Sequence, residues 1–93
     1  MKKQSPKPIL VPVAFTYADP LAGTVFVAGS FNGWKPDVAA LTQSAPGNWE
    51  IELLLSPGRH EYLFVADGKW VADPFAGEFC PNPHGGVNAV IQV

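Results

Sequence analysis

Two of the three tryptophans directly follow glycine-containing turns: Trp34 comes after Asn32-Gly33, and Trp70 comes after Asp67-Gly68-Lys69. A ring at the end of a turn can stay exposed as a rigid, amphipathic surface. Pyranose rings have apolar C–H faces that stack on such a surface, and amide side chains both donate to and accept from hydroxyl groups. The two tryptophans therefore predict a carbohydrate-binding surface, with Asn88 as the amide that binds the hydroxyls.

The same residues also have a structural explanation. The indoles of Trp34 and Trp70 could cap the two ends of a core, and Asn88 could simply be a polar residue on the outer face of the last strand. Trp49 differs from the other two tryptophans, because it begins an alternating strand and is predicted to lie in the core.

Few residues are arranged for catalysis or metal binding. Glu50 and Glu52 point to the same side of one predicted strand, where a solvated charged face is a simpler interpretation than a catalytic carboxylate pair. His60 and His84 lack a partner at metal-ligand spacing, and His60 is expected to be a hydrogen-bonded structural residue. The single cysteine, Cys80, excludes an internal disulfide and is interpreted as a partly buried loop residue. No catalytic residue, metal or cofactor is predicted.

At 93 residues the chain is predicted to be one domain, with residues 1–8 as a flexible tail and residues 9–93 as the folded module. The net charge of −2, with half of the six basic residues in the first seven positions, argues against nucleic acid as a partner. No apolar run has the length of a membrane span, and prolines interrupt the segment where a signal peptide would continue. We expect a cytoplasmic protein that does not bind membranes.

Alternating apolar residues and turn signals predict an all-β protein. The expected strands cover residues 9–17, 24–28, 41–42, 49–53, 59–66, 69–72 and 87–93. The first should be an edge strand because Pro12 removes a hydrogen-bond donor. In the last strand, Val87 and the alternate residues after it should face inward, and Asn88, Val90 and Gln92 outward. Residues 73–86, rich in proline and glycine, are predicted to form a long loop. The pattern indicates an antiparallel β-sandwich.

Several motifs occur in an order that resembles carbohydrate-binding module family 48, which includes the glycogen-binding domain of the AMP-activated protein kinase β subunit. The same family includes the early-set N-terminal domains of isoamylases and branching enzymes. The motifs are Gly29-Ser30-Phe31-Asn32-Gly33-Trp34, Pro57-Gly58-Arg59-His60-Glu61-Tyr62, Asp67-Gly68-Lys69-Trp70, Asp73-Pro74 and Val87-Asn88-Ala89-Val90-Ile91-Gln92-Val93. The resemblance covers about residues 10–93. It implies an immunoglobulin-like β-sandwich that binds α-1,4-linked glucans such as glycogen, starch or maltooligosaccharides.

The resemblance also implies individual site residues. Trp34 and Trp70 match the two tryptophans that stack on the glucan, and Asn88 matches the asparagine that binds sugar hydroxyls. Two positions depart from the family pattern: Leu63 replaces a lysine, and His84 falls near a leucine that enters the curve of the glucan. Lys69 is a hypothetical replacement for the lost cation.

The sequence thus predicts non-catalytic binding of α-1,4-linked glucans, with a catalytic or regulatory protein as a second possible partner. The alternative is a regulatory or protein–protein interaction module of the same fold, with weakened sugar binding. The two functions differ in whether Trp34 and Trp70 are both exposed and share one surface.

Overall fold

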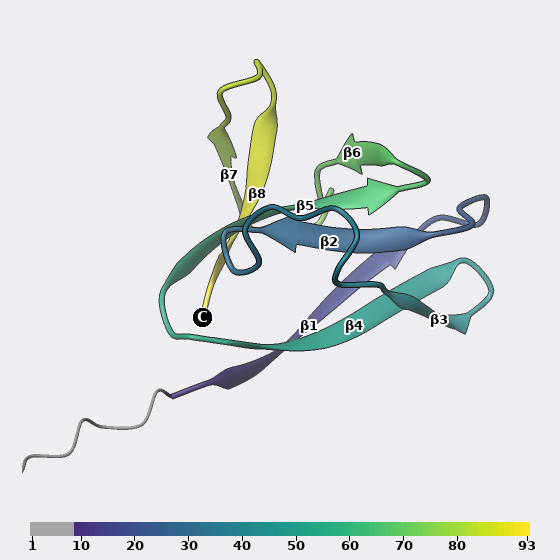
Figure 1. The fold of residues 1–93 in the computed structure, drawn as a ribbon, viewed down its shortest axis with the longest axis horizontal. Coiled ribbons are helices and arrows are strands. Elements are labelled where there is room, and N and C mark those ends of the chain that lie inside the picture. The colour runs from purple at the N-terminus through teal and green to yellow at the C-terminus, as the bar shows by residue number, and fades with distance from the viewer. Residues whose placement is uncertain (1–8) are drawn as a thin grey trace, which may run out of the picture.

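The strands of this protein follow one another along the chain with short connections, and no described residue is helical (Figure 1). The computed structural model describes residues 9–93, so the predicted tail at residues 1–8 lies outside the described residues. The strands are β1 (Val11–Ala18), β2 (Val25–Gly29), β3 (Thr42–Ala45), β4 (Asn48–Leu55), β5 (Arg59–Ala66), β6 (Lys69–Val71), β7 (Glu78–Pro81) and β8 (Val87–Gln92). Residues 9–93 include no helix that could cross a membrane.

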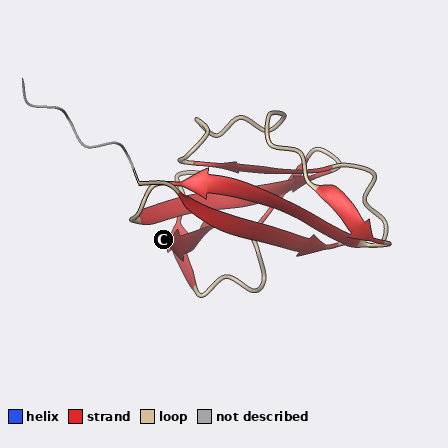
Figure 2. Ribbon diagram, turned by 90° about the horizontal axis from the view of Figure 1, so that it is seen from below, coloured by secondary structure: helices blue, strands red, loops and turns tan. Residues whose placement is uncertain are grey.

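The strands form two antiparallel sheets that pack face to face (Figure 2). The smaller sheet has the order β1-β4-β3, and the larger has the order β2-β5-β8-β7 with β6 paired to β5. Strand β1 lies at an edge of its sheet and Pro12 is exposed, a position at which a sheet tolerates a missing backbone donor. These features confirm the predicted antiparallel β-sandwich.

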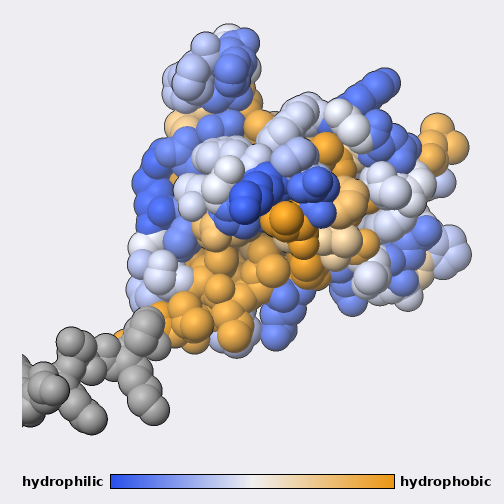
Figure 3. Space-filling model, in the orientation of Figure 1, coloured by the Kyte–Doolittle hydropathy of each residue, from blue (hydrophilic) through white to orange (hydrophobic). Residues whose placement is uncertain are grey.

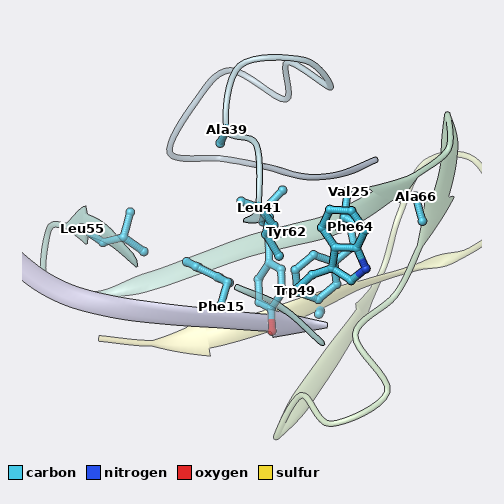
Figure 4. Close-up of a cluster of buried hydrophobic side chains, with 11 residues drawn as sticks. Phe15, Val25, Ala39, Leu41, Trp49, Leu55, Tyr62, Phe64 and Ala66 are labelled. Atoms are coloured by element: carbon cyan, nitrogen blue, oxygen red, sulfur yellow. The ribbon is translucent and has the colours of Figure 1, made fainter. Parts of the chain in front are cut away.

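Aromatic side chains from both sheets fill the space between them (Figure 4). Phe15 of β1 and Trp49 of β4 are buried against Tyr62 and Phe64 of β5, and the rings of Phe15 and Tyr62 meet edge to face at 4.9 Å. The indole N–H of Trp49 donates to the carbonyl oxygen of Asp19 at 3.2 Å. The prediction that Trp49 belongs to the core is confirmed, and the alternation predicted for β1 and β4 is present.

One prediction for the C-terminal third was wrong, and the burial of the outward residues of β8 was not foreseen. The predicted loop of residues 73–86 contains β7, a short edge strand whose proline lies at its last position, where a sheet tolerates it. In β8 Ala89 lies in the core and Asn88 and Val90 face outward, as predicted, but these two residues are buried, at 7% and 4% exposure. Val87, predicted to face inward, is 45% exposed. Strand β8 is therefore covered on both faces, because side chains of β5 and of the β7–β8 loop lie over its outer face.

Strand β5 divides its hydrogen bonds among three neighbours. One edge pairs with β2, whereas the other edge pairs with β8 over Arg59–Tyr62 and with β6 over Phe64–Ala66. Leu63 lies between these two pairings. Figure 1 shows β8 turning away from β5, whereas β6 runs alongside it. This fork opens the outer face of the larger sheet.

Gly29, at the end of β2, lies against the backbone of β5. A Cβ atom at this position would meet the carbonyl oxygen of Glu61 at 2.5 Å and the Phe31 ring at 2.6 Å. We expect Gly29→Ala to lower the free energy of unfolding by about 1–3 kcal/mol, because a rigid backbone atom must move to make room. Urea unfolding followed by tryptophan fluorescence measures the change. Gly77→Ala is the control, since a Cβ there meets nothing within 4 Å. Equal unfolding midpoints for the two variants would contradict this account.

Candidate functional site

A groove of about 800 Å³ lies at the fork of β5, on the outer face of the larger sheet. Its walls come from the turn after β2, from β5, from β6, from the β7–β8 loop and from β8. The lining residues are Ser30, Trp34, Glu61, Leu63, Trp70, Asn82, Pro83, His84 and Asn88. The β7–β8 hairpin, which carries three of them in its loop, projects from the body as a largely hydrophilic extension (Figure 3).

Trp34 is held by the turn that follows β2. The Asn32 side chain accepts a hydrogen bond from the Gly29 amide at 3.0 Å and donates to the Val27 carbonyl at 3.0 Å. The Trp34 amide donates to the Gly29 carbonyl, also at 3.0 Å. Gly33 and Trp34 both have positive φ angles, of 67° and 60°. A left-handed backbone is uncommon for tryptophan, so the bonds made by Asn32 must hold the strained residue and its ring in place.

Trp70 is presented by the β5–β6 hairpin and is 47% exposed. Asp67 and Gly68 form the turn with φ angles of 48° and 80°, the left-handed conformation expected for an Asp-Gly hairpin. The Asp67 carboxylate accepts the backbone amides of Thr24 and Gly23 at 2.9 Å each. These bonds lower the pKa of Asp67, and the bond from the Thr24 amide contributes most. The hairpin that carries Trp70 is thereby tied to the segment before β2.

Asn88 belongs to a polar network beside the tryptophans. Its Nδ2 donates to Glu61 Oε1 at 3.1 Å, and its Oδ1 accepts from Asn82 Nδ2 at 3.3 Å. Asn82 Oδ1 also accepts the amides of His84 and Gly86, at 2.9 and 3.1 Å. The alternative interpretation of Asn88, a simply exposed polar residue on the outer face, is wrong, because the side chain is buried and its amide takes part in these bonds. It lines the groove nevertheless, and through Asn82 it is linked to the loop that carries His84.

Glu61 is the acidic centre of this network. Its Oε1 accepts from the Cys80 thiol at 3.0 Å and from Asn88, and its Oε2 accepts from Arg59 at 2.8 Å. These three donors, with the thiol contributing most, lower the pKa of Glu61 to about 2. The same contact raises the pKa of Cys80 and disfavours its thiolate. Cys80 is partly buried as expected, but it lies in β7 rather than in a loop.

The structure brings together four of the five predicted site residues, and Lys69 is the exception. Successive side chains of a strand point to opposite faces. Because Trp70 lines the groove, Lys69 of the same strand points away from it. Leu63, where the resemblance places a lysine, lines the groove. No lysine or arginine is among the lining residues, so the geometry does not support Lys69 as the replacement cation.

Sequence reasoning missed the parts played by Glu61 and Asn82. The alternation of apolar and polar residues in β5 is consistent with Glu61 and Leu63 on one face, but nothing local shows that this face meets Asn88. The contact depends on the pairing of β5 with β8, in which Glu61 lies opposite Val90. Asn82 carried a local signal, since Asn before Pro in a glycine-containing segment is typical of a side chain that binds nearby backbone amides. Within residues 9–93, no group of three or more His, Cys, Asp or Glu residues is placed to hold a metal ion.

Comparison with known proteins gives a family match over nearly the whole chain. Residues 11–93 match the family described as the glycogen recognition site of AMP-activated protein kinase. The chain is 39% identical over 69 residues to 5'-AMP-activated protein kinase subunit beta-1 of Sus scrofa, covering 74% of this chain and 53% of that protein. It is 36% identical over 63 residues to FLOURY ENDOSPERM 6, chloroplastic, of Oryza sativa subsp. japonica, covering 68% of this chain. The match spans only 12% of that rice protein. A cytoplasmic location stays a prediction.

The pKa of Glu61 gives a prediction for acid stability. Because it falls from the usual 4.5 to about 2 on folding, the ionised carboxylate stabilises the fold fully above about pH 4.5. This contribution is lost as the pH falls toward 2. Glu61→Gln should therefore show a smaller loss of unfolding free energy than wild type between pH 4.5 and pH 2, measured by urea unfolding at each pH. Glu50→Gln, on the exposed face of β4, is the matched control and should follow wild type. Parallel curves for Glu61→Gln and wild type would refute the assignment.

Proposed function

Because the chain belongs to the family of the AMP-activated protein kinase glycogen recognition site, we propose that it binds α-1,4-linked glucans without catalysing a reaction on them. The ligand would lie in the groove between Trp34 and Trp70. The observation that carries this proposal is that both tryptophans line one groove together with the amide of Asn88.

The indoles supply the apolar part of the binding surface. Trp70 is about half exposed and Trp34 partly so, so a sugar can reach both rings. Each ring is fixed through its own turn, by Asn32 in one case and Asp67 in the other. Stacking on rings that are already ordered costs little conformational entropy. This supports a platform that recognises the C–H faces of glucose units.

Asn88 supplies the polar part. A primary amide offers two donors and two acceptor lone pairs. Glu61 takes one donor and Asn82 takes one lone pair, which leaves one of each for a sugar. The network therefore orients the amide and leaves part of its hydrogen-bonding capacity free. Adjacent hydroxyls of a glucose unit can each find a partner on this one side chain.

The groove is better suited to binding than to hydrolysis. Glycoside hydrolysis normally needs two carboxyl groups, one of them protonated to act as the acid. The lining residues include one carboxylate, Glu61, and its pKa of about 2 keeps it ionised. This supports a non-catalytic role for the groove. Its concave form suits the curved chain of an α-1,4-linked glucan, and we expect dissociation constants of about 1 μM to 1 mM.

The alternative, a protein-interaction module with weakened sugar binding, is favoured by a second surface. Ile9 and Leu10, directly before β1, are 70% and 51% exposed, and Leu54, which pairs with Pro12, is 59% exposed. An apolar area covers the part of the molecule near β1 and β4 (Figure 3). This surface is separate from the groove, so a protein contact there is compatible with glucan binding.

Titration with maltoheptaose and β-cyclodextrin, followed by intrinsic tryptophan fluorescence and calorimetry, tests the platform. We expect Trp70→Ala and Trp34→Ala each to weaken binding at least tenfold, because each removes one stacking surface. Phe75→Ala is the matched control, since this exposed ring lies outside the groove. Buried Trp49 reports that each variant is folded. Absence of a saturable wild-type signal at millimolar sugar would refute the proposal and favour the protein-interaction module.

A second variant tests the role assigned to Lys69. We expect Lys69→Ala to leave the affinity for maltoheptaose within about twofold of wild type, because its side chain points away from the face that carries Trp70. The same calorimetric titration measures it. A loss of affinity similar to that of Trp70→Ala would show instead that Lys69 reaches the ligand and replaces the missing cation.

A further inference from the structure

The groove carries an unusual distribution of charge for a site that binds a polyhydroxyl ligand. Among its lining residues Glu61 is the only acidic side chain, and none is lysine or arginine. Glu61 lines the groove, and its side chain is 33% exposed. The charge nearest a bound sugar is therefore negative.

Arg59 does not cancel this charge. Its guanidinium contacts Glu61 Oε2 at 2.8 Å, but it also lies 3.8 Å from the carboxylate of Glu78. One cation is thus shared by two anions, and the trio keeps a net charge of −1. Arg59 is not a lining residue, whereas Glu61 is. A ligand in the groove meets the carboxylate and not the guanidinium.

The carboxylate is also unable to turn away from a ligand. Both of its oxygens are engaged, Oε1 by Cys80 and Asn88 and Oε2 by Arg59. Rotation of the side chain would break three hydrogen bonds and would release Asn88, which holds Asn82 and the β7–β8 loop. The negative charge is a fixed part of the groove.

We propose that Glu61 is the specificity-determining residue by which this groove selects uncharged α-glucans over α-glucans that carry phosphate esters. The inference rests on the proposed function and refines its ligand. A phosphate monoester carries a charge of about −1.5 to −2 at neutral pH, and repulsion by a fixed carboxylate in a partly desolvated groove weakens its binding. The hydroxyls of an uncharged glucan meet no such barrier and can use the free donor and acceptor of Asn88.

The test compares three ligands by calorimetry. They are maltoheptaose, maltoheptaose with a phosphate ester on one 6-hydroxyl, and maltoheptaose with an acetyl ester on the same 6-hydroxyl. The acetyl ester is uncharged and serves as the steric control. Titrations at about 20 mM and about 1 M NaCl separate charge from shape, because the screening length falls to about 3 Å at 1 M salt. The proteins are wild type, Glu61→Gln and, as the matched control, Glu50→Gln, whose exposed carboxylate lies on β4 of the other sheet, outside the groove.

We expect wild type to bind the phosphate ester roughly three- to tenfold more weakly than the acetyl ester at low salt, and nearly equally at high salt. Glu61→Gln should bring the low-salt ratio close to one, and Glu50→Gln should leave it as in wild type. A salt-independent ratio, or equal binding of both esters by wild type, would overturn the proposal while leaving glucan binding intact. Failure of wild type to bind maltoheptaose itself would overturn both.

Discussion

The division of β5 among three neighbouring strands is the constraint on which this structure depends. Its inner face carries Tyr62 and Phe64 into the core, and its outer face carries Glu61 and Leu63 into the groove. Because β8 and β6 pair with different halves of the same edge, they must diverge at Leu63. The groove is thus a consequence of strand pairing, and the core that stabilises the sandwich also fixes the floor of the site.

The three segments that surround the groove are stabilised by the same kind of interaction. In each, a short side chain accepts backbone amides: Asn32 in the turn of Trp34, Asp67 in the hairpin of Trp70, and Asn82 in the loop of His84. Such residues replace a missing secondary-structure partner and tolerate tight turns. Loops are ordinarily the mobile parts of a domain, and these bonds offset that tendency where a preformed surface is needed. Among the described residues, the fold contributes rigidity to the site without any helix.

Sequence reasoning predicted the strands where alternation within a segment gave a local signal, and it failed where the outcome depended on register. The turns directly before Trp34 and Trp70 led to their selection as candidate site residues, and the structure places both in one groove. The burial of Asn88 and the role of Glu61 arise from residues 27 positions apart, joined by the β5–β8 pairing. Strand β7 was missed because its proline and the flanking glycines indicate a loop, although an edge position accommodates them. The alternation of residues in β8 does not show that side chains of other elements bury its outer face.

The same strand register explains why the residue at position 63 affects the charge that Glu61 presents to the groove. The family pattern places a lysine where this chain has Leu63, two residues along the same face of β5 from Glu61. A cation there would lie beside the carboxylate and offset its charge. With leucine in that place, Arg59 alone balances Glu61, from outside the groove, and it is shared with Glu78. The side of Glu61 that faces a ligand thus keeps its negative character. The loss of one lysine therefore does more than remove a polar contact: it leaves a negative charge in the groove where a lysine beside Glu61 would have neutralised it.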